Sequence, residues 1–218
     1  MQGESRPQAA RRFGGLKRFV DYNLSKEKVW GGKGIDIADH WIKTHPYVKP
    51  EIVPSELAYD DFSQLFGNVF EHSEWIAERA FKREMGPVHD TATGLHALMT
   101  QVFRAASNEE RLGVLNAHPD LAGKLAAAKR LTAASEAEQA SAGLDALTDA
   151  ERARINELNA AYVEKHGFPF IIAVRDNTKA QIMAAMETRV ANDRETEFAA
   201  ACKQVERIAE LRIRAIMG

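Results

Sequence analysis

TDAERARINELNAAYVEKHGFPFIIAV, residues 148–174, carries the clearest structural signals in this chain of 218 residues. Its first four residues, Thr148 to Glu151, match a capping box, in which the first and fourth side chains bond each other's backbone amides. The helix that opens there is predicted to run to about Lys165 and to stop at His166-Gly167, because glycine accepts the left-handed backbone of a helix end. The apolar run 168–174 has the length of a buried strand but no visible partner strand. We interpret it as extended or distorted-helix backbone that crosses the core.

Helical spacing continues on both sides of this segment, from Ser55 to the end of the chain. Apolar residues recur three and four positions apart, as in amphipathic helices. Ser107, followed by Glu109 and Glu110, indicates a helix start, and Asn177 is placed to cap a helix that ends near Val190. The predicted helices besides the one above cover residues 59–66, 74–83, 91–106, 109–116, 178–190 and 195–216. Alternating strand–helix units are absent, so the predicted fold class is all-α, a compact multi-helix single domain over residues 51–218.

Residues 1–50 are predicted to form a separate N-terminal extension. Pro46, Pro50 and Pro54 follow one another at four-residue spacing, which stops helices and favours an extended connector. Short amphipathic helices are predicted before it, over residues 8–24 and 35–42. The extension has few apolar residues for a core of its own, so we expect it to pack on something else or to be partly disordered.

Composition excludes several classes of protein. The hydrophobic fraction is 45% and the charged fraction 28%, which is ordinary for a globular protein. The net charge of −2 provides no field to recruit nucleic acid, and no apolar run approaches the roughly 20 residues of a membrane span. A single cysteine, Cys202, excludes an internal disulfide framework. Without a secretory signal, the expected location is the cytoplasm.

No metal or nucleotide cofactor is predicted. The seven histidines include no pair at the four-residue spacing that places two ligands on one helical face. Asp36, Asp39 and His40 lie close together in the sequence, but we interpret them as solvated surface. Glycine-rich phosphate loops and a Gly-x-Ser-x-Gly elbow are also missing.

Two local features each allow a chemical and a structural interpretation. His118 ends a predicted helix, and Pro119 after it keeps the histidine out of the α-region and fixes the direction of its side chain. An imidazole there is either an acid/base near pH 7 or a favourable charge at a helix end. Similarly, Ser135 and Glu138 form either a second capping box or part of a binding site.

Two further features have the same ambiguity. The run from Phe168 to Ile172 looks like core, but an irregular segment also leaves backbone N–H and C=O groups available to a ligand. Arg212 either lies on the surface with its neighbours Arg207 and Arg214 or turns inward toward a carboxylate. Taken singly, none of these features decides a function.

In this order, however, the motifs resemble the OHCU (2-oxo-4-hydroxy-4-carboxy-5-ureidoimidazoline) decarboxylase family. The similarity spans about residues 55–217 and rests on several stretches. They are FGNVFEHSEWIAERAF (66–81), HPDLAG (118–123), SEAEQASAGL (135–144), LNAAYVEKHGFPFIIAV (158–174) and ERIAELRI (206–213). The resemblance implies an all-helical homodimer without metal or organic cofactor. It also implies a small-molecule substrate, OHCU, which is converted to (S)-allantoin and carbon dioxide in urate degradation.

The resemblance also implies roles for particular residues. His118 would be the catalytic histidine, Glu138 the key carboxylate and Arg212 the arginine that faces an anionic group. The implied substrate contacts are Pro119, Ser135, Glu136, Ala137, Glu138, Gln139, Phe170, Ile171, Ile172, Ala173 and Val174. His166 departs from the family, which often has phenylalanine before Gly-Phe-Pro-Phe.

Residues 16–46 separately resemble the tail of polysaccharide-deacetylase-like allantoinases, whose catalytic barrel is missing here. This similarity implies fusion or association with an allantoinase but no allantoinase activity of the chain. Two alternatives remain beside the decarboxylase. One is a non-catalytic helical dimerisation or interaction module, which predicts an exposed apolar face and no pocket at His118. The other is a related lyase or hydrolase for a different ureido compound.

Overall fold

The computed structural model describes residues 21–22, 25–26, 33–44, 51–119, 121, 144 and 147–218. The chain divides into two compact units, Met1–Lys49 and Pro50–Gly218. In the first unit, helix α2 (Gly34–Thr44) agrees with the helix predicted over 35–42, and all its residues are exposed. The helix predicted over 8–24 lies almost wholly outside the described residues.

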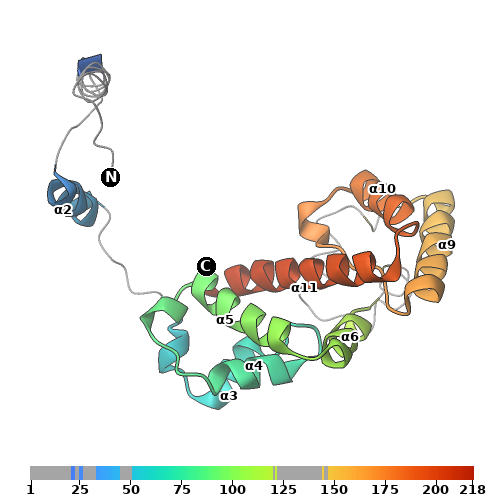
Figure 1. The fold of residues 1–218 in the computed structure, drawn as a ribbon, viewed down its shortest axis with the longest axis horizontal. Coiled ribbons are helices and arrows are strands. Elements are labelled where there is room, and N and C mark those ends of the chain that lie inside the picture. Colours follow the sequence, from blue (N-terminus) through green and yellow to red (C-terminus); the bar gives the residue numbers. More distant parts are fainter. Residues whose placement is uncertain are drawn as a thin grey trace, which may run out of the picture. The chain divides into compact units, whose positions relative to one another are not determined.

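The second unit consists of α-helices and short 3₁₀ helices (Figure 1). In chain order they are η1 (Pro54–Glu56), α3 (Tyr59–Phe66), α4 (Glu74–Phe81), η2 (Pro87–His89), α5 (Ala92–Ala105), α6 (Asn108–Ala117), α9 (Asp149–His166), η4 (Val174–Asp176), α10 (Lys179–Arg189) and α11 (Arg194–Met217). The described residues contain no strand, which confirms the all-α class. None of the described helices has the length and apolar character needed to cross a membrane.

Helix α11 is the long central element of this unit (Figure 1). It packs along α5 and also contacts α6 and α9, while α10 packs on α9 and α4 packs on both α3 and α5. Its inward face carries small and branched residues such as Ala201, Val205 and Ala209, all at most 1% exposed. Because this face touches helices from both halves of the unit, residues far apart in sequence can meet along it.

Local sequence signals account for several helix ends. Ser107 caps α6 as predicted and forms a capping box with Glu110, and Thr148 forms the predicted capping box with Glu151. Helix α9 ends at Gly167, whose φ of 77° lies in the left-handed region that glycine tolerates. The prediction that Asn177 caps α10 is wrong, because Thr178 caps it together with Gln181. The side-chain amide of Asn177 instead donates to the Ala173 carbonyl oxygen at 2.9 Å.

The apolar run after Gly167 crosses the core without forming a strand, as predicted. Residues 168–173 are buried and non-helical, and the backbone then enters η4. Phe168 and Phe170 pack edge-on against Tyr162 of α9, with ring centroids 5.9 and 5.3 Å away. Aromatic packing, rather than a β-ladder, therefore holds this segment in place.

Candidate active site

His118 lies at the C-terminal end of α6 with only 4% of its surface exposed. Its backbone is extended (φ −71°, ψ 129°), as the following Pro119 predicts. The imidazole Nδ1 is 2.8 Å from the carbonyl oxygen of Val114. Since a carbonyl only accepts hydrogen bonds, Nδ1 carries the proton, and Nε2 is the atom that can accept or return one. The helix end thus orients a buried acid/base group.

A small cavity lies beside His118 and joins residues that are distant in the sequence. Its described lining residues are His118, Pro119, Leu121, Phe170, Ile171, Ile172 and Ile208. Five residues, Phe170 to Val174, were predicted to contact the substrate through their backbone. Three of them, Phe170 to Ile172, line the same cavity as His118 and Pro119. Ala173 and Val174 are buried but are not among the lining residues.

The cavity volume is about 10 Å³, which is room for about one water molecule. A planar ring with a ureido arm is much larger than that. This volume is smaller than the predicted substrate needs. Apart from His118, the described lining residues have apolar side chains.

Arg212 turns inward, as one of its two interpretations predicted. It is 6% exposed and lies one helical turn after Ile208, which lines the His118 cavity. Its Nη2 is 2.7 Å from Glu71 Oε2, and its Nη1 is 3.4 Å from the carbonyl oxygens of Asn68 and Val69. Glu71 was not among the predicted site residues. The sequence signal that could have indicated it is an acidic residue directly after the apolar residues Val69 and Phe70.

Residues 135–139, including Glu138, lie outside the described residues. Their assignment to the substrate site, and the capping-box alternative for Ser135 with Glu138, therefore both stay predictions.

The backbone of residues 170–174 is only partly available to a ligand. The Ile171 carbonyl oxygen accepts from Arg189 Nη1 at 2.9 Å, and the Ala173 amide donates to Gln204 Oε1 at 2.9 Å. The Ala173 carbonyl oxygen accepts from both Asn177 and Asp176. Although the segment is irregular, the Ile171 carbonyl and the Ala173 amide are therefore not left for a ligand, because side chains from α10 and α11 bond to them. These bonds instead hold the cavity wall in place.

A buried polar network supports this wall from behind. The Glu197 carboxylate, which is fully buried, accepts from the Tyr162 hydroxyl at 2.6 Å, from Arg189 Nε at 2.9 Å and from Asn192 Nδ2 at 2.7 Å. Burial and the bond to Glu197 both raise the pKa of the Tyr162 phenol. Arg189 also stacks 4.5 Å above the Phe170 ring. A buried charge with three donors is well compensated, so the network fixes α9, α10 and α11 relative to the 168–174 segment.

His166 makes the stability of this region sensitive to pH. Burial is the main cause that lowers the pKa of its imidazole below the ordinary value of 6.5. Protonation is therefore less favourable in the folded than in the unfolded protein, and stability falls as the pH drops below about 6.5. We expect the Tm of the wild type to drop more between about pH 7.5 and about pH 5 than that of His166→Phe. Phenylalanine retains the ring that packs 4.4 Å from Tyr162. Equal drops in the two proteins would contradict this role of His166.

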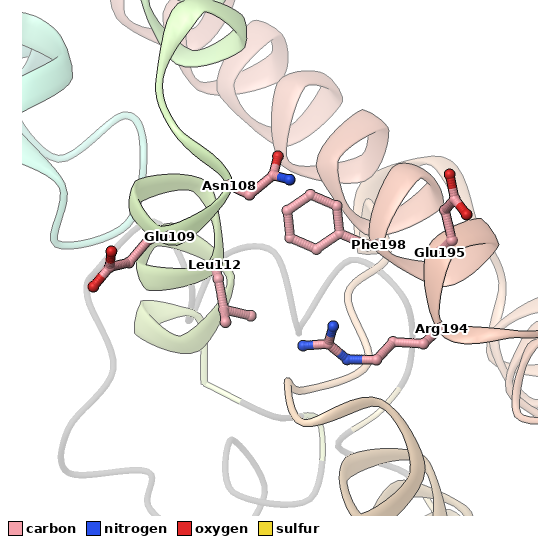
Figure 2. Close-up of a pocket in the computed structure, with 6 residues that line it drawn as sticks. All are labelled: Asn108, Glu109, Leu112, Arg194, Glu195 and Phe198. Atoms are coloured by element: carbon pink, nitrogen blue, oxygen red, sulfur yellow. The ribbon is translucent and has the colours of Figure 1, made fainter.

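A larger hollow of about 480 Å³ lies between the N-terminal ends of α6 and α11 (Figure 2). Its lining residues are Asn108, Glu109, Leu112, Arg194, Glu195 and Phe198. Figure 2 shows the Arg194 guanidinium extending toward Leu112, and its Nε donates to the His166 carbonyl oxygen at 3.0 Å. Among the described residues that line this hollow there is no predicted site residue and no histidine. We therefore place the candidate active site at His118, although the cavity there is smaller.

In the part of the chain that the structure describes, no three His, Cys, Asp or Glu side chains are grouped so that they could hold a metal ion.

Known proteins share both the sequence and the fold of this region. A profile of the family named OHCU decarboxylase matches residues 55–214. A 2-oxo-4-hydroxy-4-carboxy-5-ureidoimidazoline decarboxylase from Haloferax volcanii is 44% identical over 154 residues, which are 71% of this chain and 88% of that protein. A uric acid degradation bifunctional protein from a Bacillus species is 35% identical over 74% of this chain but only 31% of its own length.

Two solved structures extend the comparison. An (S)-allantoin synthase superposes with a TM-score of 0.60 at 32% identity, covering 76% of this chain and 52% of that one. An OHCU decarboxylase crystallised in the presence of (S)-allantoin superposes with a TM-score of 0.55 at 23% identity, covering 69% and 95%. The described part of the chain is thus all-helical, and its sequence relatives include proteins named for uric acid degradation. The chain belongs to the OHCU decarboxylase family.

Proposed function

We propose that this protein is a carboxy-lyase that decarboxylates 2-oxo-4-hydroxy-4-carboxy-5-ureidoimidazoline to (S)-allantoin. The observation that carries the proposal is the family match over residues 55–214, together with the buried imidazole that this region places against the Phe170–Ile172 segment. The relatives named as decarboxylases favour the enzyme over the non-catalytic alternative.

The reaction needs electrons to be stabilised and a proton to be delivered to one face of the ring. Loss of carbon dioxide from C4 leaves an electron pair there. The adjacent C=N–C=O system of the substrate takes up this pair as an enolate-like intermediate, so the substrate is its own electron sink. The enzyme has to hold the carboxylate out of the ring plane, stabilise the developing charge and protonate one face.

In this proposal His118 is the proton-transfer group, beside the carboxylate and the C4 hydroxyl. Its Nδ1 is held by the Val114 carbonyl oxygen, so Nε2 faces the reaction. Arg212 binds a carbonyl or the departing carboxylate through charge-assisted hydrogen bonds. Glu138 accepts hydrogen bonds from ureido or ring N–H groups, and Pro119 and residues 135–139 and 170–174 complete the contacts.

The activity is tested by generating the unstable substrate in place from urate, with urate oxidase and the hydrolase that follows it. Circular dichroism then follows the appearance of chiral allantoin with and without this protein. We expect faster formation of one enantiomer in its presence. Product that stays racemic and forms at the unassisted rate would show that the chain is not this decarboxylase.

We further propose that the protein is a cytoplasmic homodimer and associates with an allantoinase. The homodimer is what the sequence resemblance implies, and light scattering after gel filtration tests it: a molecular mass of one chain would contradict it. The relatives that combine two urate-degrading activities in one chain support the association. Co-purification with an allantoinase from the native cell tests it, and its absence from the purified material would count against it.

A further inference from the structure

Glu71 and Arg212 form a buried ion pair between two distant parts of the chain. Their side chains are only 3% and 7% exposed, and Nη2 of the arginine lies 2.7 Å from Oε2 of the glutamate. The same short loop also offers the carbonyl oxygens of Asn68 and Val69, each 3.4 Å from Nη1. One loop therefore contacts both terminal nitrogens of the guanidinium.

The loop is shaped so that Glu71 points inward. Ser73 holds it through an N–H bond to the Phe70 carbonyl oxygen at 2.8 Å and a hydroxyl bond to the Glu71 carbonyl oxygen at 3.0 Å. His72 has a φ of 47°, the single positive value for a non-glycine residue in the described part of the chain. A left-handed backbone is unfavourable for a residue other than glycine. The turn leaves the His72 side chain 62% exposed while the adjacent Glu71 is 3% exposed.

The ion pair lies next to the candidate active site. Ile208 lines the His118 cavity, and Arg212 follows it by four residues on α11. Residues four apart share one face of a helix and are about 6 Å apart along its axis. The loop at residues 68–71 thus holds the arginine one helical turn from the cavity wall.

Stability alone is a poor explanation for this pair. Removing two charges from water is costly, and well-packed apolar residues often stabilise a fold as well or better. What the pair does provide is orientation. A guanidinium is planar and rigid, so fixing Nη1 and Nη2 also fixes the direction of its remaining N–H groups.

We propose that Glu71 is a positioning residue for Arg212, setting the plane of the guanidinium that receives the anionic group of the substrate. This inference rests on the proposed function, in which Arg212 binds a carbonyl or the departing carboxylate. Glu71 acts through Arg212 and does not touch the substrate.

The test is a double-mutant cycle of Glu71→Gln and Arg212→Met, measured as kcat and KM for OHCU generated in place. Glutamine keeps the shape of Glu71 and one acceptor oxygen but loses the charge that orients the guanidinium. We expect Glu71→Gln alone to lower kcat about 10-fold and to change KM by less than about threefold, because the arginine charge stays in place. In the Arg212→Met background the same change should alter kcat by less than about twofold, since the group that Glu71 orients is gone.

Folding is separated from positioning by dividing each rate by the folded fraction, measured by circular dichroism at the assay temperature. If Glu71→Gln does not fold, Glu71→Asp takes its place. It keeps the charge but withdraws it by one carbon–carbon bond, about 1.5 Å, and should lower kcat similarly. Glu206→Gln is the matched control. It removes another α11 glutamate that pairs with an arginine, Arg104, at 2.6 Å, and should leave kcat within about twofold.

The outcomes distinguish this inference from the proposed function. Equal loss of kcat in both backgrounds, or no loss in the wild-type background, overturns the positioning role while the decarboxylase stands. Full activity of Arg212→Met removes the role of the arginine, and the positioning role with it. A wild type that does not accelerate allantoin formation overturns the function itself, and the inference falls with it.

Discussion

Replacing His118 by asparagine is expected to lower kcat about 10²–10⁴-fold, the contribution typical of a positioned acid/base group. In the wild type, His118 Nδ1 is 2.8 Å from the Val114 carbonyl oxygen. The side-chain nitrogen of asparagine can take the place of Nδ1 and keep this hydrogen bond. What disappears is Nε2, the atom assigned to proton transfer. The stereospecific allantoin assay measures the loss, and the Tm of the variant should stay close to that of the wild type.

His89→Asn is the matched control for this variant. His89 also uses Nδ1 in a backbone contact, accepting from the Gly86 amide at 3.1 Å, but it belongs to η2 and not to the cavity. Its replacement should leave kcat unchanged. Near-native turnover of fresh substrate by His118→Asn would show that the assignment of the catalytic histidine is wrong.

The second large effect is expected for Glu138→Gln, which should remove most of the turnover, about 10²-fold or more, without unfolding the protein. A carboxylate accepts the substrate's N–H groups with twice the strength of a neutral amide oxygen, because the bond is charge-assisted. Steady-state kcat and the Tm are both measured, because the alternative role of Glu138 as a helix-capping residue predicts a change only in the second.

Glu151→Gln provides the comparison for that alternative. Glu151 belongs to a real capping box, in which its Oε2 accepts from the Thr148 amide at 2.8 Å. Its replacement should cost up to about 1 kcal/mol of stability and leave kcat unchanged. If Glu138→Gln behaves like Glu151→Gln in both measurements, the capping interpretation is right and the substrate role is wrong.

The features that the sequence predicted well depend on neighbouring residues. The good predictions are the helix cap at Ser107, the capping box at Thr148, the left-handed Gly167 and the extended backbone of His118 before Pro119, and all follow from contacts within four positions. The cap of α10 shows the limit of such reasoning. Asn177 and Thr178 are both good capping residues. Thr178 caps the helix, because the side-chain amide of Asn177 donates to the Ala173 carbonyl oxygen in the preceding turn.

Prediction of the site was less complete. His118 and the Phe170–Ile172 segment do meet at one cavity, and Arg212 is buried on the same face of α11 as a residue that lines it. Glu71 was missed, although it lies in a stretch that supported the family resemblance. The role of its carboxylate depends on the ion pair with Arg212. No spacing rule in the sequence predicts that a loop after α3 contacts the last helix.

Consecutive residues were thus enough to establish an all-helical chain, the ends of its main helices, an oriented histidine and the family to which it belongs. Packing alone settled which groups face one another: Glu71 with Arg212, and Arg189 with the Ile171 carbonyl oxygen. The physical reason is the range of the interactions. Caps and turns are decided by bonds to the nearest backbone, whereas a buried charge takes whichever partner the assembled helices bring within about 3 Å.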